Sequence, residues 1–124
     1  MILKPNMVIS AMDCSTQAGV EQVAEWTVQT LKRRVPAAVP GIAFLSGGQS
    51  EVVASEHLNA MNQLGDLPWT LSFSYGRALQ NSALNTWAGK SDNVADAQGK
   101  LAHRAHMNFS AAIGKYSADL EQAG

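Results

Sequence analysis

The chain has 124 residues, of which 46% are apolar and 15% charged. This length and apolar content are enough to bury the core of one small domain. The same composition excludes a disordered tail. Nine Lys and Arg residues stand against ten Asp and Glu, and the formal net charge of −1 excludes a global field that would hold nucleic acid or an anionic membrane. No apolar run reaches the roughly 20 residues that span a bilayer, no export signal is expected, and the single cysteine, Cys14, suits the reducing cytoplasm.

Strands and helices alternate along the chain. Residues 1–3 predict a strand that ends at Lys4, because Pro5 keeps the preceding residue out of the helical region. A helix is predicted from an N-cap at Gly19 to the three basic residues that end at Arg34. The later strands are predicted at 39–45 and 69–74, and the later helices at 50–64 with Ser50 as N-cap, from 77 to about 87, and at 92–112.

Apolar residues at helical spacing predict one buried face on each helix. The predicted faces comprise Val20, Val23, Ala24, Thr27 and Leu31, then Ala54, Leu58 and Met61, then Leu79, Ala83, Leu84 and Trp87, then Val94, Ala97, Leu101 and Ala105. Each of the three tryptophans, Trp26, Trp69 and Trp87, is expected to pack in the core or between helix and sheet.

The βαβαβα order with a further helix predicts a single α/β domain, residues 1–124, built on a parallel sheet. In such folds ligands bind at the carboxyl ends of the strands. Three strand ends carry residues that can react with or bind a ligand: Lys4, the run Ser46-Gly47-Gly48, and the run Ser74-Tyr75-Gly76-Arg77.

Lys4 follows an apolar run and can serve as a nucleophile. An amine held between apolar walls loses affinity for its proton, and the neutral amine attacks carbonyl carbons. The alternative is an ordinary strand-end lysine that reaches into water. The residues alone leave both interpretations open.

The two glycine-containing runs predict a phosphate site. Ser46, Gly47 and Gly48 come between a strand and a helix, where bare backbone amides and a helix N-terminus form an anion cradle. The second run repeats this pattern and adds Arg77, whose guanidinium presents paired donors to phosphate oxygens. The alternatives are glycines that only permit a tight turn and a surface arginine.

The remaining candidates are weaker. His103 and His106 lie three positions apart, but no third ligand is suggested, so no metal is expected; His57 is on another predicted helix. Cys14 has no evident base partner and is expected to be inert. Asp13, the acid nearest to Lys4 in the sequence, lies in a loop.

Length excludes a complete (β/α)8 barrel, which needs about 200 residues or more, yet three runs resemble part of one. They are 3–7 (LKPNM), 44–50 (FLSGGQS) and 73–80 (FSYGRALQ), and their order and spacing are similar to the C-terminal portion of class I fructose-1,6-bisphosphate aldolase. The resemblance extends from residue 1 to about 116. It implies a partial TIM barrel: the last three βα units, strands six to eight, plus a C-terminal helix.

The resemblance also implies roles. Lys4 matches the Schiff-base lysine. A phosphate-binding loop of the family is matched by Ser46, Gly47 and Gly48. Further substrate contacts are matched by Ser74, Gly76 and Arg77. No cofactor or metal is implied. The implied partner is a sugar phosphate, not nucleic acid or a membrane, and the implied assembly of the full-length protein is a homotetramer.

This sequence departs from the family in two respects. The acid–base residues of the family have no counterpart here and would lie upstream of residue 1, so this chain alone is expected to be inactive in cleavage. The terminal tyrosine of some relatives is also absent. Two alternatives remain: a non-catalytic half-barrel that retains only sugar-phosphate binding or assembly, and an unrelated phosphate-binding βαβ module.

Overall fold

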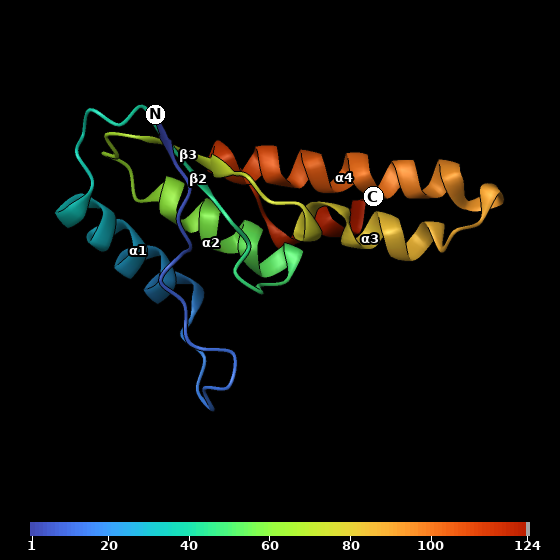
Figure 1. The fold of residues 1–124 in the computed structure, drawn as a ribbon, viewed down its shortest axis with the longest axis horizontal. Helices are drawn as coiled ribbons and strands as arrows, with labels where there is room; N and C mark the ends of the chain where they lie inside the picture. Colours follow the sequence, from blue (N-terminus) through green and yellow to red (C-terminus); the bar gives the residue numbers. More distant parts are fainter. Residues whose placement is uncertain (124) are drawn as a thin grey trace.

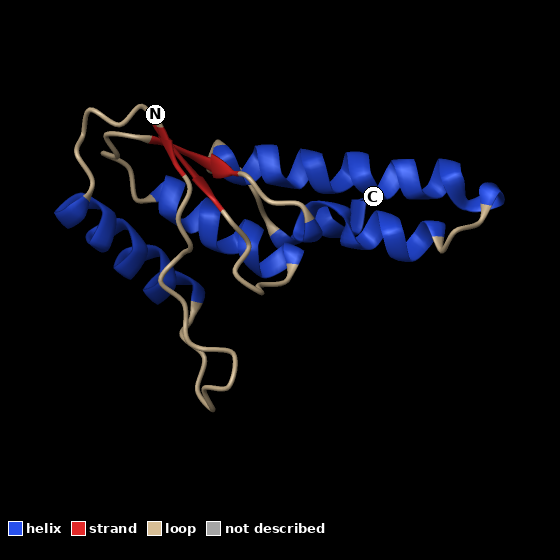
Figure 2. Ribbon diagram, viewed as in Figure 1, coloured by secondary structure: helices blue, strands red, loops and turns tan. Residues whose placement is uncertain are grey.

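A three-stranded parallel sheet organises the computed structural model, which describes residues 1–123. Its strands are β1 (Ile2–Leu3), β2 (Gly41–Phe44) and β3 (Thr70–Phe73), in the spatial order β1-β2-β3. Leu3 lies opposite Ile42, and Phe44 lies opposite Phe73. Because both pairs are parallel, the three strands end at the same edge of the sheet (Figure 2). The predicted parallel α/β order is confirmed.

Four α-helices and two 3₁₀ segments accompany the strands in the described part of the chain. They are α1 (Val20–Arg34), α2 (Glu51–Gln63), α3 (Arg77–Trp87), η1 (Ser91–Asn93), α4 (Val94–Ala112) and η2 (Ala118–Ala123). The first two helices connect strands, and the rest follow β3. Figure 1 shows α1 and α2 beside the sheet, and α3 and α4 as a long hairpin that extends beyond it.

Local signals explain where the helices begin. The Val53 N–H donates to the Ser50 hydroxyl at 3.2 Å and so caps the N-terminus of α2. Gly19 is the N-cap of α1, and the last turn of that helix holds three basic residues, where cations favour the helix dipole. Both predicted N-caps are confirmed.

The core lies against one face of the sheet. Ile42, Phe44 and Leu71 are almost fully buried, whereas Thr70 and Ser72, which alternate with Leu71 along β3, are exposed. The helices add residues that their spacing predicted to be buried, among them Val23, Ala24, Thr27, Leu31, Ala54, Leu58 and Met61. Parallel sheets are usually covered on both faces, so the exposed face of β3 is unusual.

The prediction for the tryptophans is right for one of the three. Trp69 is buried, and its Nε1–H donates to the Pro36 carbonyl oxygen at 2.9 Å. Trp26 and Trp87 are 47% and 44% exposed, so their predicted burial is wrong. Side-chain size gives a tendency to be buried but does not say whether a neighbouring element covers the position.

The predicted apolar stripe of α4 is wrong at three of its four positions. Ala97 is buried, but Val94, Leu101 and Ala105 are exposed. The buried residues of the second half are Arg104, Met107, Ser110 and Ala111. The reason is the shape of the hairpin: the first half of α4 lies beyond the sheet (Figure 1), with α3 alongside. Leu84 and Trp87 of α3 line an apolar groove there.

Candidate functional site at the carboxyl edge of the sheet

The three chemically interesting runs follow the three strands at one edge. Lys4 comes directly after β1 and Ser74 directly after β3. Two backbone hydrogen bonds continue the ladder into these segments: the Leu45 N–H donates to the Pro5 carbonyl oxygen at 3.1 Å, and the Ser74 N–H donates to the Phe44 carbonyl oxygen at 2.9 Å. The runs are therefore held side by side by the sheet itself.

The loop after β2 needs glycine at position 47. Gly47 and Gly48 have φ angles of +58° and +85°, the left-handed region that glycine adopts without strain. A Cβ atom on Gly47 would overlap the side-chain amide of Asn6, which follows β1. The close approach of Asn6 thus joins the loop after β2 to the segment that carries Lys4.

Arg77 and the loop after β2 border the same hollow. Arg77 is the first residue of α3 and is exposed; Ser46, Gly48 and Gln49 lie on the other side of the hollow. A cation at a helix N-terminus is electrostatically unfavourable unless an anion joins it. An anion in this hollow would meet the Arg77 guanidinium, a serine hydroxyl and the Gly48 backbone, although Glu51, the first residue of α2, also lines the hollow.

The other predicted site residues are exposed at the same edge. Gly76 is the N-cap of α3, and its carbonyl oxygen accepts from the Leu79 and Gln80 N–H groups. Ser74 and Gly76 do not line the hollow that Arg77 borders. The Lys4 side chain is exposed too, so the described residues do not supply the apolar walls expected around it.

Sequence reasoning did not single out Gln49, which lies directly behind the loop. Its Nε2 donates to the Ser46 carbonyl oxygen at 2.9 Å and lies 3.6 Å from the Met7 sulfur, and its Oε1 lies 2.5 Å from His57 Nδ1. His57 is 4% exposed, and burial lowers the pKa of its imidazole. A glutamine next to Gly-Gly and a histidine two helical turns later were the only available signals.

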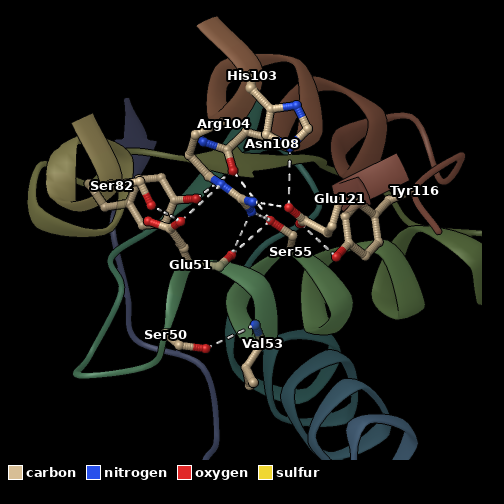
Figure 3. Close-up of polar contacts among 11 residues, drawn as sticks. Ser50, Glu51, Val53, Ser55, Ser82, His103, Arg104, Asn108, Tyr116 and Glu121 are labelled. Atoms are coloured by element: carbon tan, nitrogen blue, oxygen red, sulfur yellow. Dashed lines mark hydrogen bonds and ion pairs between the residues drawn. The ribbon is translucent and has the colours of Figure 1, made fainter. Parts of the chain in front are cut away.

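A second polar region, the Arg104 cluster, was also missed (Figure 3). It comprises Glu51, Ser55, Tyr75, Ser82, His103, Arg104, Asn108, Tyr116 and Glu121. Arg104 is 2% exposed and stands at its centre. Its guanidinium donates to the Glu51 carbonyl oxygen and the Ser55 hydroxyl, each at 3.1 Å, and forms an ion pair with Glu121.

The cluster joins four segments of the chain. Ser82 of α3 donates to Glu51 of α2, and Tyr116 donates from Oη to Glu121 of η2 at 2.8 Å. Tyr75, which lies inside the predicted phosphate run, contacts Asn108 at 2.5 Å. The helices α2, α3 and α4 and the segment η2 are thereby fixed to one another.

Burial and partners shift three pKa values in the cluster, and burial raises that of Tyr116. Burial raises the pKa of Tyr75 to about 12, although Arg104 acts in the opposite direction. Burial alone would raise the pKa of Glu121, but hydrogen bonds from Arg104 and Tyr116 lower it overall. Glu121 is therefore held as a carboxylate.

The described residues contain no group of three or more His, Cys, Asp or Glu side chains that could hold a metal ion. His103 points to Glu121, with Nε2 3.4 Å from Oε2, and His106 is exposed. Cys14 is exposed and donates from Sγ to the Thr16 carbonyl oxygen. Among residues 1–123, no helix is both long and apolar enough to cross a membrane.

The fold and this edge are typical of α/β proteins that bind ligands at the carboxyl ends of parallel strands. Residues 1–124 match the family model described as fructose-bisphosphate aldolase class-I, of the glycolytic type. The chain belongs to this family.

The sequences of curated relatives match almost the whole chain. It is 54% identical over 123 residues to the chloroplastic fructose-bisphosphate aldolase of Oryza sativa subsp. japonica, covering 99% of this chain and 31% of the relative. The aldolase of Dictyostelium discoideum is 52% identical over 118 residues, 95% of this chain and 33% of the relative. This chain thus spans about a third of the length of the curated relatives it matches.

A solved structure shows the same fold. The fructose-bisphosphate aldolase of Plasmodium falciparum, crystallised with TRAP and a small-molecule inhibitor, superimposes with a TM-score of 0.91 at 54% identity. The match covers 94% of this chain and 34% of that structure. The α/β arrangement of a small parallel sheet with four helices is therefore that of part of an aldolase.

Proposed function

We propose that this chain supplies the Schiff-base lysine and the phosphate-binding segments of a class I fructose-1,6-bisphosphate aldolase. The observation that carries the proposal is the meeting of three runs at one sheet edge, with Arg77, Ser46 and Gly48 around one hollow, in a chain that matches the aldolase family throughout. Strands β1, β2 and β3 would be strands six, seven and eight of the barrel. The open face of β3 supports this assignment, because a barrel strand faces other strands across the interior.

In the proposed reaction, Lys4 is the nucleophile. Its neutral amine attacks the ketose carbonyl, and loss of water gives an iminium ion. The iminium draws electrons from the bond between carbons three and four, which breaks and releases glyceraldehyde 3-phosphate. Protonation and hydrolysis of the enamine give dihydroxyacetone phosphate and restore Lys4. Because the iminium accepts the electron pair of the broken bond, the mechanism requires no metal.

The phosphate groups would be bound by the hollow beside Arg77. The guanidinium, the Ser46 hydroxyl and the Gly48 amide border this hollow and are suited to phosphate oxygens, and Gly47 would join them from the same loop. Ser74 and Gly76 would extend these contacts from the end of β3. None of the three strand-end runs, 4–7, 46–49 and 74–77, contains Asp or Glu, so we assign proton transfer to residues outside this chain.

The proposal extends to the organisation of the protein. Residues 1–124 would be one domain, the C-terminal part of an aldolase barrel, in a protein that is a homotetramer at full length. The cytoplasm is the proposed compartment; some relatives are chloroplastic by name.

A second candidate function is sugar-phosphate binding without catalysis. The exposure of Lys4 favours it, because an exposed amine lacks the surroundings that favour the neutral nucleophile. In this case the hollow binds phosphate and no covalent adduct forms.

Reductive trapping separates the two functions. The 124-residue chain is incubated with dihydroxyacetone phosphate and sodium borohydride, and the modified lysine is located by peptide mass spectrometry. We expect one reduced adduct, on Lys4, that is lost in Lys4→Arg and retained in Lys32→Arg, a matched exposed lysine on α1. Phosphate binding without an adduct supports the binding-only function. The absence of both contradicts the proposal as a whole.

A further inference from the structure

The loop from Ser46 to Gly48 is held from behind by one side chain. Gln49 Nε2 lies 2.9 Å from the Ser46 carbonyl oxygen, and the Gln49 N–H also donates to that oxygen at 3.1 Å. Two glycines in the left-handed region give this loop more accessible conformations than any other residue pair would. A restraint on Ser46 therefore matters more here than in a stiffer segment.

The orientation of the Gln49 amide follows from its partners. The Ser46 carbonyl oxygen only accepts, so the NH₂ group of Gln49 must face it. Oε1 then faces His57 Nδ1 at 2.5 Å, and an oxygen there requires that Nδ1 carry the proton. His57 is thus the donor that keeps Gln49 from turning its oxygen towards Ser46.

This orientation decides where a backbone donor points. In a trans peptide the C=O and N–H groups lie on opposite sides, and all peptide bonds of the described residues are trans. When Gln49 holds the Ser46 carbonyl inward, the N–H of Gly47 points away from Gln49. His57 thereby acts on the direction of a backbone amide in the predicted phosphate loop from outside the hollow that Arg77 borders.

We propose that His57 is a positioning residue for the phosphate loop, acting through Gln49. The inference rests on the proposed function, because it assumes that the loop binds phosphate. His57 is almost fully buried on α2, 8 positions from Gln49, and does not line the hollow that Arg77 borders. Its contribution is to substrate affinity, not to the Schiff-base step on Lys4.

The test is a binding measurement with inorganic phosphate on the 124-residue chain. Amide NMR shifts of Gly47 and Gly48 are followed during the titration. His57→Leu removes the donor, and we expect phosphate to bind about five- to ten-fold more weakly, the effect of one lost hydrogen bond. His57→Asn places an amide NH₂ close to the position of Nδ1, and affinity within about two-fold of the wild type is expected.

A matched control separates positioning from stability. Asn59→Leu removes another buried hydrogen bond from the same helix, the one that Asn59 Oδ1 accepts from the Tyr116 N–H. It should lower the melting temperature but leave phosphate affinity unchanged. A parallel loss of affinity in Asn59→Leu would show that α2 acts only through general stability and would overturn the inference.

A second variant covers the case in which His57→Leu does not fold. Gln49→Met preserves side-chain length and removes both amide hydrogen bonds, so it should weaken phosphate binding as much as His57→Leu. The double variant should lose no more than either single one, because both act in one chain of contacts. Additive losses overturn the inference.

The outcomes for the inference and for the proposed function are distinct. If the wild type binds phosphate and His57→Leu or Gln49→Met binds it equally well, the inference is wrong and the proposed function stands. If the wild type neither binds phosphate nor forms the Lys4 adduct, the proposed function fails and the inference with it.

Discussion

Arg77 and Arg104 carry the same guanidinium on adjacent helices of one hairpin, in opposite surroundings. Arg77 begins α3, is exposed and borders a hollow beside a glycine loop. Arg104 lies within α4, is buried and donates to Glu51, Ser55 and Glu121. The arginine suited to a ligand is therefore the one whose donors the fold leaves exposed to solvent.

The backbone differs between the two regions as well. At the edge of the sheet, glycines with positive φ expose amides, whereas the Arg104 cluster joins helices through side chains. Even in the cluster, Glu51 Oε2 and Arg104 Nε are buried without a hydrogen-bond partner among the described residues. The cluster is therefore sensitive to any change that removes one of its remaining contacts.

The largest expected effect is on the stability that Arg104 provides. Arg104→Met leaves the carboxylates of Glu121 and Glu51 without their cation, and breaking a buried ion pair costs about 3 kcal/mol. Urea denaturation measures the change in the free energy of unfolding. In contrast, Arg77→Met should change that free energy by less than about 0.5 kcal/mol and weaken phosphate binding. Equal destabilisation by both variants would remove the contrast between the two arginines.

The second prediction concerns the loop glycine. Gly47→Ala should destabilise the chain by about 2 kcal/mol, since alanine is strained at φ +58° and its Cβ would overlap Asn6. Gly65→Ala is the matched control: Gly65 has φ +69°, but no atom lies within 4 Å of its added Cβ. It should lose only about 1 kcal/mol.

Thermal or urea unfolding of both glycine variants gives the difference between them. That difference measures the contact between Asn6 and Gly47, and Asn6→Ala should recover part of it in the Gly47→Ala background. If the two glycine variants are equally unstable, Asn6 does not constrain the loop.

The smallest expected effect is a change in pH dependence. The folded protein lowers the pKa of Glu121 below its ordinary value of 4.5, so its stabilising contribution is present above pH 4.5 and is lost as the pH falls below it. Glu121→Gln should therefore flatten the decline in the free energy of unfolding between about pH 5 and 3. Glu25→Gln, an exposed carboxylate on α1, is the control. An equal effect of both variants would show that the folded protein does not lower the pKa of Glu121.

Much of the architecture could be predicted from local pattern. The strand after residue 1, the caps Gly19 and Ser50, and the core residues of α1 and α2 follow from periodicity and capping rules that act within a few residues. The packing of Trp26 and Trp87 could not be predicted in this way. Their exposure depends on where the α3–α4 hairpin and α1 lie, which no local pattern records.

The residues of the candidate site also fall into those that local patterns predict and those that they do not. Glycines after a strand and an arginine at a helix start are local signals, and they identified the Ser46–Gly48 and Ser74–Arg77 runs. Arg104 carries no such signal, because its partners lie 17 to 53 positions away. Gln49 and His57 lie only 8 positions apart, but no local rule pairs a loop glutamine with a helical histidine. A buried arginine in particular violates the usual preference for exposed charge, so sequence reasoning assigned α4 an apolar stripe.

The sequence by itself determined the alternation of strands and helices, the residue types at each strand end, and through these the family. Short-range sterics, capping and hydrophobic spacing act within one element, so they can be recognised one element at a time. Only the tertiary structure decided which donors are exposed and which are paired. Arg104 reaches Glu121 across 17 positions and Glu51 across 53, and whether a charge meets a ligand or a partner side chain depends on such contacts.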